Sequence, residues 1–164
     1  MAITEKNLFN IDTGILQKDA FIVIVRTEWN AVIVDKLEEG CIKILQQYKM
    51  NNYKIINVPG AFEIPFGIKS FWENSKLEKP QAFIALACVL RGDTPHFDYI
   101  CKAVTDGIVQ LNLSLPAPVI FGVLTVDDNE QAKERVGGEQ GHKGEEAAIT
   151  ALKMILLQQS FYDK

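Results

Sequence analysis

Four short, almost continuously apolar runs alternate with segments whose apolar residues recur every three or four positions, and this alternation most constrains the fold. The runs cover residues 21–25, 54–58, 82–90 and 118–124. Each is too short for a buried helix and predicts a strand. Strands that are apolar throughout are typical of a parallel sheet covered on both faces. With right-handed crossovers, the pattern predicts a flavodoxin-like three-layer α/β/α sandwich with a four-stranded parallel sheet.

The segments between the runs carry helix signals. Asn30 is expected to cap the first helix. A short second helix is predicted over residues 64–74, and the last helix over residues 143–159. The buried stripe of the first helix falls on one face at spacings of three and four: Val34, Leu37, Cys41, Ile44, Leu45 and Tyr48.

Two further helix starts are predicted. Thr94 is expected to cap a helix with Pro95 as its first residue, where the missing N–H of proline costs nothing. Asp127 with Glu130 three residues later is typical of a capping box for a short helix. The buried stripe of the helix after Pro95 is expected to comprise Phe97, Cys101, Val104, Ile108 and Leu111.

The bulk properties indicate one domain over residues 1–164. Residues 1–19 are expected to form an N-terminal extension that packs on a neighbouring subunit. The net charge of -4 argues against a nucleic-acid partner. No apolar run approaches the roughly 20 residues that cross a bilayer, which argues against a membrane partner. The charged start of the chain lacks a secretory signal, so we expect a cytoplasmic protein.

The three cysteines, Cys41, Cys88 and Cys101, are odd in number and lack Cys-x-x-Cys spacing. This pattern favours neither a disulfide framework nor a zinc site, and no metal is expected. We interpret all three as small core residues, because free cysteines are usually buried.

Ligands of such sheets bind beyond the carboxyl ends of the strands, which selects residues 26–30, 58–63, 90–96 and 121–127. In the third segment, Arg91 and Gly92 lead into a helix start. Free N–H groups there, with the positive end of the helix dipole, suit a phosphate. The same residues also fit a helix start that binds nothing.

His96 lies in the first turn of that helix. The helix dipole disfavours its imidazolium form, whereas an arriving phosphate would favour it. A histidine with these opposed influences is well placed to transfer protons near neutral pH, so His96 is a candidate catalytic residue.

The segment 58–63 has two interpretations. The turn at Gly60 and the carboxylate of Glu63 could present polar groups to a flat ring, or Glu63 could simply help the next helix to start. Trp29 lies in a loop rather than on an apolar stripe, so it could stack on a planar ligand. Phe121 is equally compatible with a core strand position.

The glycine-rich run 137–144 lacks the spacing of a phosphate-binding Walker loop, and no Gly-x-Gly-x-x-Gly follows a strand. Nucleotide binding by those routes is therefore not supported. Arg135, just before the run, would by itself be interpreted as a solvated charge.

Together these segments resemble the 6,7-dimethyl-8-ribityllumazine synthase family over roughly residues 12–158. The matching segments are residues 58–63, 91–99, 118–124 and 130–135 with the glycine run, in order and spacing. The combination of Gly60-Ala61-Phe62-Glu63 with the run from Arg91 through Tyr99 is highly specific.

The resemblance implies a transferase that needs no cofactor and joins 5-amino-6-(D-ribitylamino)uracil to 3,4-dihydroxy-2-butanone 4-phosphate. It implies His96 for proton transfer and Arg135 for pairing with the phosphate. The substrate pocket that it implies contains Trp29, Asn30, Ala61, Phe62, Glu63, Cys88, Val89, Leu90, Asp93, Thr94, Phe121, Arg135 and Lys143.

The resemblance also implies a homo-oligomer: a pentamer with shared active sites, which in some members packs into a 60-subunit shell that can associate with riboflavin synthase. The short link between the last two helices favours the shell over the free pentamer. Two departures from the family pattern stand out: the carboxylate of Asp93 beside the phosphate site, and Glu139-Gln140-Gly141-His142 within the link.

Two other classes of protein are compatible with this fold. A binding protein on the same fold would hold a lumazine or flavin without making it, but it would not need both His96 and Arg135. A phosphorylated receiver domain needs clustered acids after the first strand, where the chain supplies only Glu28.

Overall fold

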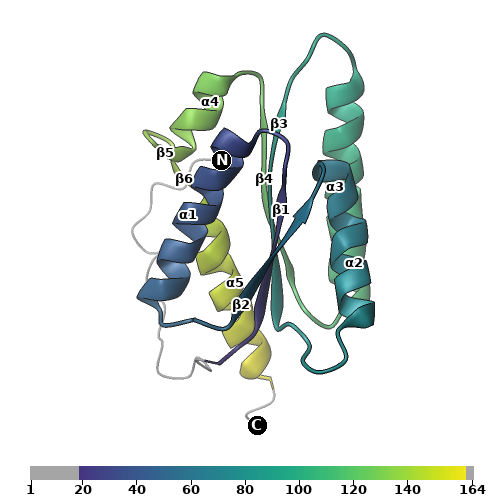
Figure 1. The fold of residues 1–164 in the computed structure, drawn as a ribbon, viewed down its shortest axis with the longest axis vertical. Helices are drawn as coiled ribbons and strands as arrows, with labels where there is room; N and C mark the ends of the chain where they lie inside the picture. Colours follow the sequence, from purple (N-terminus) through teal and green to yellow (C-terminus); the bar gives the residue numbers. More distant parts are fainter. Residues whose placement is uncertain (1–18, 162–164) are drawn as a thin grey trace.

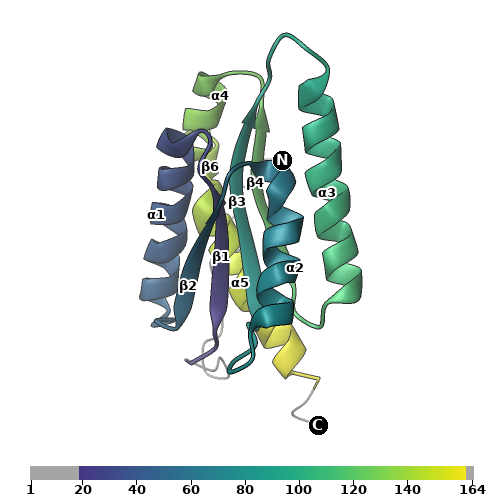
Figure 2. The ribbon, with the colours of Figure 1, turned by 45° about the vertical axis from the view of Figure 1, so that its right-hand side comes forward.

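The computed structural model describes residues 19–161 and shows a three-layer α/β/α fold. Its sheet has four parallel strands in the order β2-β1-β3-β4. Helices α1 and α5 cover one face, with α4 above them, and α2 and α3 cover the other (Figures 1 and 2). The predicted fold class is confirmed.

The sheet strands are β1 (Ile22–Thr27), β2 (Tyr53–Val58), β3 (Ala82–Leu90) and β4 (Val119–Val126). The helices are α1 (Ala31–Gln47), α2 (Ile64–Asn74), α3 (His96–Ser114), α4 (Asn129–Glu134) and α5 (Lys143–Gln159), with a 3-10 turn η2 (Ala61–Glu63) before α2. The predicted bounds of α2, α5 and β3 are confirmed.

Alternating side chains of the central strands form two cores. Ile22 and Ile24 of β1 face α1 and α5, whereas Val23 and Val25 face α2 and α3. All four are fully buried. This burial on both faces explains why the central strands are apolar throughout.

Strand β1 extends two residues beyond the predicted end, so Arg26 lies within the strand rather than in a loop. Its guanidinium donates to Asp35 at 2.5 Å and to Glu38 at 2.7 Å, both on α1. Burial lowers the pKa of Arg26, but its hydrogen bonds to the two carboxylates and their negative charges together outweigh burial and raise it. Arg26 therefore fastens α1 to the sheet.

The predicted helix caps are wrong in detail. Asn30 is the N-cap residue of α1, as predicted, with φ 58°, and its carbonyl accepts the N–H groups of Ile33 and Val34, but its side chain makes no capping bond. Helix α3 begins at His96, one residue later than predicted, and Thr94 does not cap it. The cap of α4 is Asp128, which accepts from the N–H of Gln131 at 2.8 Å. For Asn30 the reason is a distant contact, because its side chain donates to the carbonyl of Cys88 instead.

The glycine-rich run forms a hairpin of β5 (Val136–Gly138) and β6 (Gly141–His142) that was not predicted. Gly137 and Gly141 have φ of 116° and 81°, the left-handed region that glycine adopts without strain. A Cβ at Gly144 would lie 2.0 Å from the carbonyl oxygen of Leu37, so glycine lets α5 approach α1 closely.

The cysteine prediction is confirmed for Cys41 and Cys88, which are buried, while Cys101 is only half-buried. Burial raises the pKa of the Cys41 thiol to about 12 and that of Cys88 to about 11. Thiols with such pKa values are poor nucleophiles near neutral pH.

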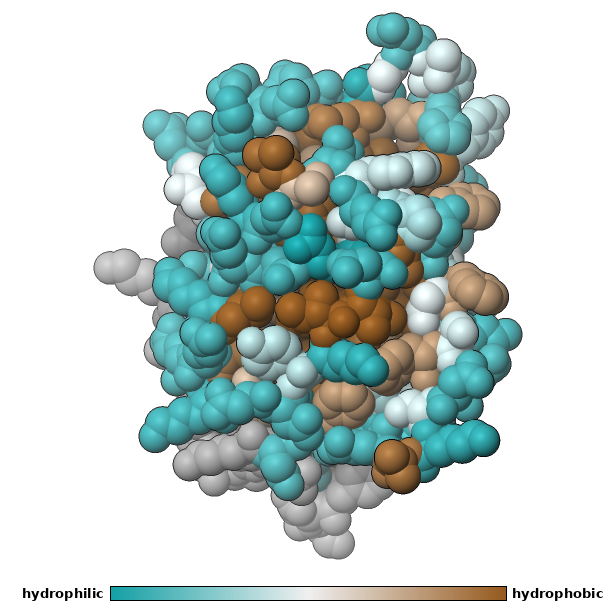
Figure 3. Space-filling model, in the orientation of Figure 1, coloured by the Kyte–Doolittle hydropathy of each residue, from teal (hydrophilic) through white to brown (hydrophobic). Residues whose placement is uncertain are grey.

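Within residues 19–161, none of the helices has the length and apolar character needed to span a bilayer. The same residues contain no group of three or more His, Cys, Asp or Glu side chains placed to hold a metal ion. Figure 3 shows apolar side chains at mid-height on the face where edge strand β2 lies. Ile55 and Ile56 of this strand are only partly buried.

Candidate active site

Trp29 lies where β1 and β2 end. Its backbone N–H donates to the carbonyl of Pro59 at 3.1 Å. A Cβ at Gly60 would lie 2.7 Å from the indole ring, so the absence of a side chain lets the ring lie against the turn. The Trp29 side chain is nevertheless 65% exposed, which leaves ring surface for a planar ligand.

Asn30 links the ends of two strands. Its side-chain amide donates to the carbonyl of Cys88 at 2.7 Å, across 58 positions of sequence. The Cys88 side chain is buried in the core, so Cys88 meets this region through its backbone. Val89 and Leu90, which follow in β3, are half-buried.

The carboxylate of Glu63 closes the turn that follows β2. Glu63 accepts the backbone N–H of Gly60 at 3.1 Å, which matches the interpretation that Glu63 helps the next helix to start. The other interpretation, that the carboxylate contacts a ligand, stays a prediction. Ala61 is buried, whereas Phe62 is 59% exposed.

Arg91 organises the loop between β3 and α3. It donates to Asp127 at 2.7 Å and to Asp98 at 3.2 Å, and its guanidinium lies 4.0 Å from the centre of the Phe97 ring. The hydrogen bond from Arg91 lowers the pKa of Asp127. Arg91 thus joins the end of β4 to the first turn of α3.

His96 is the first residue of α3 and is exposed, as are Asp93 and Thr94 before it. Because no side chain caps α3, the first N–H groups of this long helix remain available to an anion. A Cβ at Gly92 would meet no atom within 4 Å, so the loop leaves open space around it.

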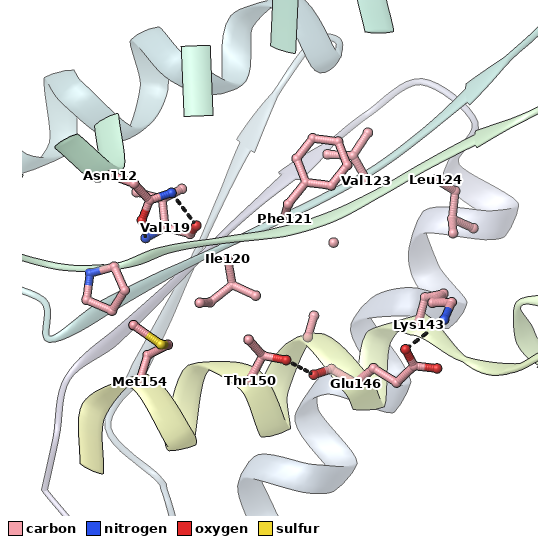
Figure 4. Close-up of a pocket in the computed structure, with 13 residues that line it drawn as sticks. Asn112, Val119, Ile120, Phe121, Val123, Leu124, Lys143, Glu146, Thr150 and Met154 are labelled. Atoms are coloured by element: carbon pink, nitrogen blue, oxygen red, sulfur yellow. Dashed lines mark hydrogen bonds and ion pairs between the residues drawn. The ribbon is translucent and has the colours of Figure 1, made fainter. Parts of the chain in front are cut away.

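A separate pocket of about 420 Å³ lies where β4 forms the open edge of the sheet and meets α5 (Figure 4). Phe121, on β4, is 43% exposed and points away from α5. On α5, Lys143 and Glu146 form an ion pair at 2.7 Å, with 19% and 15% of their side chains exposed. We call this region the edge pocket.

Glu146 was not singled out from the sequence. Its spacing of three residues from Lys143 on a helix is the signal that could have identified it, because side chains at that spacing are neighbours.

Arg135 follows α4 and donates to the carbonyl of Gln131 at 2.8 Å. Its own carbonyl accepts the N–H of Lys143 at 2.8 Å, so Arg135 and the start of α5 are adjacent.

The structure therefore divides the predicted site residues into two groups. Trp29, Asn30 and residues 61–63 gather at the ends of β1 and β2, and β3 contributes residues 88–90. Phe121 and Lys143 line the edge pocket, whose lining includes none of those residues. Residues 61–63 follow β2, which lies three strand spacings or about 14 Å from β4. Strand β3 is paired directly with β4, with Cys88 opposite Leu124, so residues 88–90 lie between the two groups.

The fold and these residues define a flavodoxin-like α/β enzyme whose polar groups gather beyond the strand ends. The family model described as 6,7-dimethyl-8-ribityllumazine synthase matches residues 19–159. The chain belongs to this family and is a transferase of riboflavin biosynthesis that forms 6,7-dimethyl-8-ribityllumazine. The alternative of a pure binding protein is set aside, because the family is one of enzymes.

Three relatives, each named 6,7-dimethyl-8-ribityllumazine synthase, illustrate the similarity. The protein of Parabacteroides distasonis is 45% identical over 94% of this chain and 98% of its own length. The protein of Bacteroides fragilis is 48% identical over 80% of this chain and 92% of its own length. The protein of Flavobacterium johnsoniae is 40% identical over 97% of this chain and 84% of its own length.

Proposed function

We propose that the residues at the strand ends bind 5-amino-6-(D-ribitylamino)uracil and that the start of α3 binds the phosphate of 3,4-dihydroxy-2-butanone 4-phosphate. The observation that carries this proposal is the uncapped start of α3, with His96 as its first residue, beyond the carboxyl end of β3. The helix amides bind the phosphate while the imidazole remains beside the reacting atoms.

The pyrimidine is proposed to stack on the exposed ring of Trp29. Asn30 holds the backbone of Cys88, so that Val89 and Leu90 present the strand end to the pyrimidine edge. The turn of Ala61, Phe62 and Glu63 receives the ribityl chain. One oxygen of Glu63 already accepts the N–H of Gly60, and the rest of the carboxylate can accept ribityl hydroxyls.

The phosphate is proposed to lie against the backbone of Asp93 and Thr94 and to pair with Arg135. Only the backbone of Asp93 faces the phosphate, because its exposed carboxylate can point to solvent. A planar guanidinium can bind phosphate through two parallel hydrogen bonds and stabilise the charge that develops as phosphate leaves.

The chemistry requires proton transfers at one place. An amine of the pyrimidine attacks the ketone of the butanone, and its two protons pass to the ketone oxygen, which leaves as water and leaves an imine. Loss of the proton on the adjacent carbon then expels phosphate and gives a second ketone, on which the other amine closes the ring with loss of a second water. His96 can accept protons from nitrogen and carbon and donate them to the departing oxygens. No further co-reactant is required. Holding both substrates together supplies much of the rate, since proximity is worth about 7–11 kcal/mol.

We further propose that each complete site combines the strand ends of one chain with Phe121, Arg135 and Lys143 of a neighbouring copy in a pentamer. Two observations support this arrangement: Phe121 and Lys143 line a pocket that contains none of the residues at the ends of β1 and β2, and Arg135 is joined to Lys143 by a backbone hydrogen bond. Beyond Val119, which is bonded to the side chain of Asn112, the edge of β4 is open to a partner. Large exposed apolar side chains also favour burial against a partner: Trp29, Val32, Phe62, Phe66, Tyr99, Leu113 and Phe121. The N-terminal extension, expected to pack on a neighbour, lies almost entirely outside the described residues.

A complementation experiment tests the shared site. His96→Ala and Arg135→Ala chains, each of low activity, are unfolded together, refolded as mixed oligomers and assayed for lumazine formation. A shared site places intact His96 and intact Arg135 together in some sites, so activity is expected to rise well above either variant alone. The matched control mixes wild-type chains with the double variant. Mixed oligomers with no gain would place both residues in one subunit.

Light scattering tests the assembly. With a chain mass of 18.4 kDa, a pentamer has a mass of about 90 kDa and a shell of twelve pentamers about 1.1 MDa. We expect the shell, because the link between α4 and α5 is short and a longer link would obstruct contact between pentamers. A single species of about 90 kDa would rule out the shell.

Tryptophan fluorescence tests the pyrimidine subsite. Bound 6,7-dimethyl-8-ribityllumazine is expected to quench the emission of Trp29 because the two rings stack. The quenching should disappear in Trp29→Ala and persist in Trp72→Phe, since Trp72 packs against Phe83 in the core. Undiminished quenching in Trp29→Ala would place the pyrimidine elsewhere.

The enzyme is proposed to act in the cytoplasm and to associate there with riboflavin synthase. Its three cysteines are all free, which suits a reducing compartment.

A further inference from the structure

His142 ends the β5–β6 hairpin and precedes α5, and its ring is seated on α1. A Cβ at Gly40 would lie 2.1 Å from Cε1 and 2.5 Å from Nδ1 of His142. Only a glycine therefore leaves room for the ring at this position of α1. Hairpin and helix lie side by side in Figures 1 and 2.

The seated ring is in an environment that suits its neutral form. Its Nδ1 is buried and has no hydrogen-bond partner within residues 19–161. The charged groups that face it are Lys43 from α1 and Glu145 and Glu146 from α5. Lys43 and Glu145 pair with each other at 2.7 Å, and Glu146 pairs with Lys143. Protonation would place a charge on a partly buried ring whose Nδ1–H has no acceptor among the described residues.

The hairpin connects this ring to two residues of the proposed site. Val136 pairs with His142 in the small sheet, next to Arg135 in sequence. The N–H of Lys143 donates to the carbonyl of Arg135 at 2.8 Å, which closes the base of the hairpin. A displacement of the His142 ring would therefore shift the backbone that carries Arg135 and Lys143.

We propose that His142 is a positioning residue whose neutral ring, seated on Gly40, holds Arg135 and Lys143 in place, and that acid releases this hairpin from α1. The proposal rests on the substrate roles assigned above to Arg135 and Lys143. It makes phosphate recognition sensitive to a histidine that touches no substrate.

The direction of the pH effect follows from the ring's surroundings. Burial lowers the pKa of His142 below its ordinary value of about 6.5. When the hairpin is released, the pKa of His142 returns to its ordinary value, whereas in the seated form it is lower. At a pH between the pKa of the seated form and that of the released form, the released hairpin therefore binds a proton more readily. The seated form is fully favoured above about pH 6.5 and loses stability as the pH falls, by about tenfold in population per unit of pKa difference.

Amide hydrogen exchange, combined with steady-state enzyme kinetics, tests the proposal. In the wild type, protection of the Gln140 and Lys143 amides, which bond Glu134 and Arg135, should fall as the pH decreases from about 7.5 to about 5. The KM for the butanone phosphate should rise at least threefold more than the KM for the pyrimidine. His142→Asn cannot take up the proton, and His142→Gln is a second variant of larger volume. Either variant, if folded by circular dichroism, should lose the acid-induced change, and because all of these proteins keep His96, the difference between them isolates His142.

Gly40→Ala serves as the comparison, because its Cβ would displace the ring at every pH and should mimic acid at about pH 7.5. Protection factors that do not depend on pH in the wild type, or that change equally in both His142 variants, would overturn the proposal. A loosened hairpin with an unchanged KM would overturn the positioning role. If Arg135→Ala leaves phosphate binding intact, the assignment of Arg135 fails, and the exchange data still decide whether His142 holds the hairpin.

Discussion

His96→Ala is expected to lower turnover roughly 10- to 1000-fold, which brackets the usual contribution of a general acid–base group. The KM values should change much less, because proton transfer matters mainly in the transition state. His96 is exposed at the start of α3, so removal of its side chain leaves the core intact. The rate of lumazine formation at saturating substrates measures the effect.

Two controls separate proton transfer from a structural role. His96→Asn keeps a polar group of similar reach but cannot exchange protons, so its turnover should fall as far as that of His96→Ala. Free imidazole should restore part of the turnover of His96→Ala and none in a variant with altered folding. Wild-type turnover in a well-folded His96→Ala enzyme would contradict the assigned role.

Arg135→Ala is expected to weaken binding of the butanone phosphate by about 1.5–3 kcal/mol, or roughly 10- to 150-fold. The pyrimidine should bind almost as in the wild type, because the arginine is assigned to the phosphate alone. Calorimetry with each substrate separately, or with inorganic phosphate as a probe, measures the difference. Arg135 already donates to the carbonyl of Gln131 and still has other N–H groups for a ligand.

Arg135→Lys provides the matched comparison. Lysine keeps the charge but loses the planar fork, so only part of the phosphate affinity should return. Complete rescue by lysine would show that charge alone is recognised. Equal weakening of both substrates by Arg135→Ala would instead indicate that the side chain maintains the structure of the hairpin.

Periodicity determines most of the fold in this chain. The apolar runs of β1 and β3 face two cores, and side-chain alternation along each strand is a local property that any short window of sequence contains. The bounds of α2, α5 and β3 were predicted for the same reason. The family motifs around Gly60 and His96 likewise identify the candidate site from consecutive residues.

Contacts between distant residues decide what the sequence does not show. Asn30 is a residue type that often caps helices through its side chain. Here its side-chain amide donates to the carbonyl of Cys88 instead, because the ends of β1 and β3 are neighbours only in the folded sheet. Thr94 is also a common capping residue, yet its side chain does not cap α3. The proposed phosphate site requires these uncapped backbone amides.

The positions of the edge residues depend on strand order. In sequence, Phe121 and Lys143 look like members of one pocket with Trp29, but β3 separates β4 from the end of β1 that Trp29 follows. The fit of His142 against Gly40 joins residues 102 positions apart, and no local pattern predicts it. Local periodicity therefore determined the elements and the motifs of this protein. Only the packing of those elements decided which motifs share a surface, because strand order and close contact are properties of the assembled sheet.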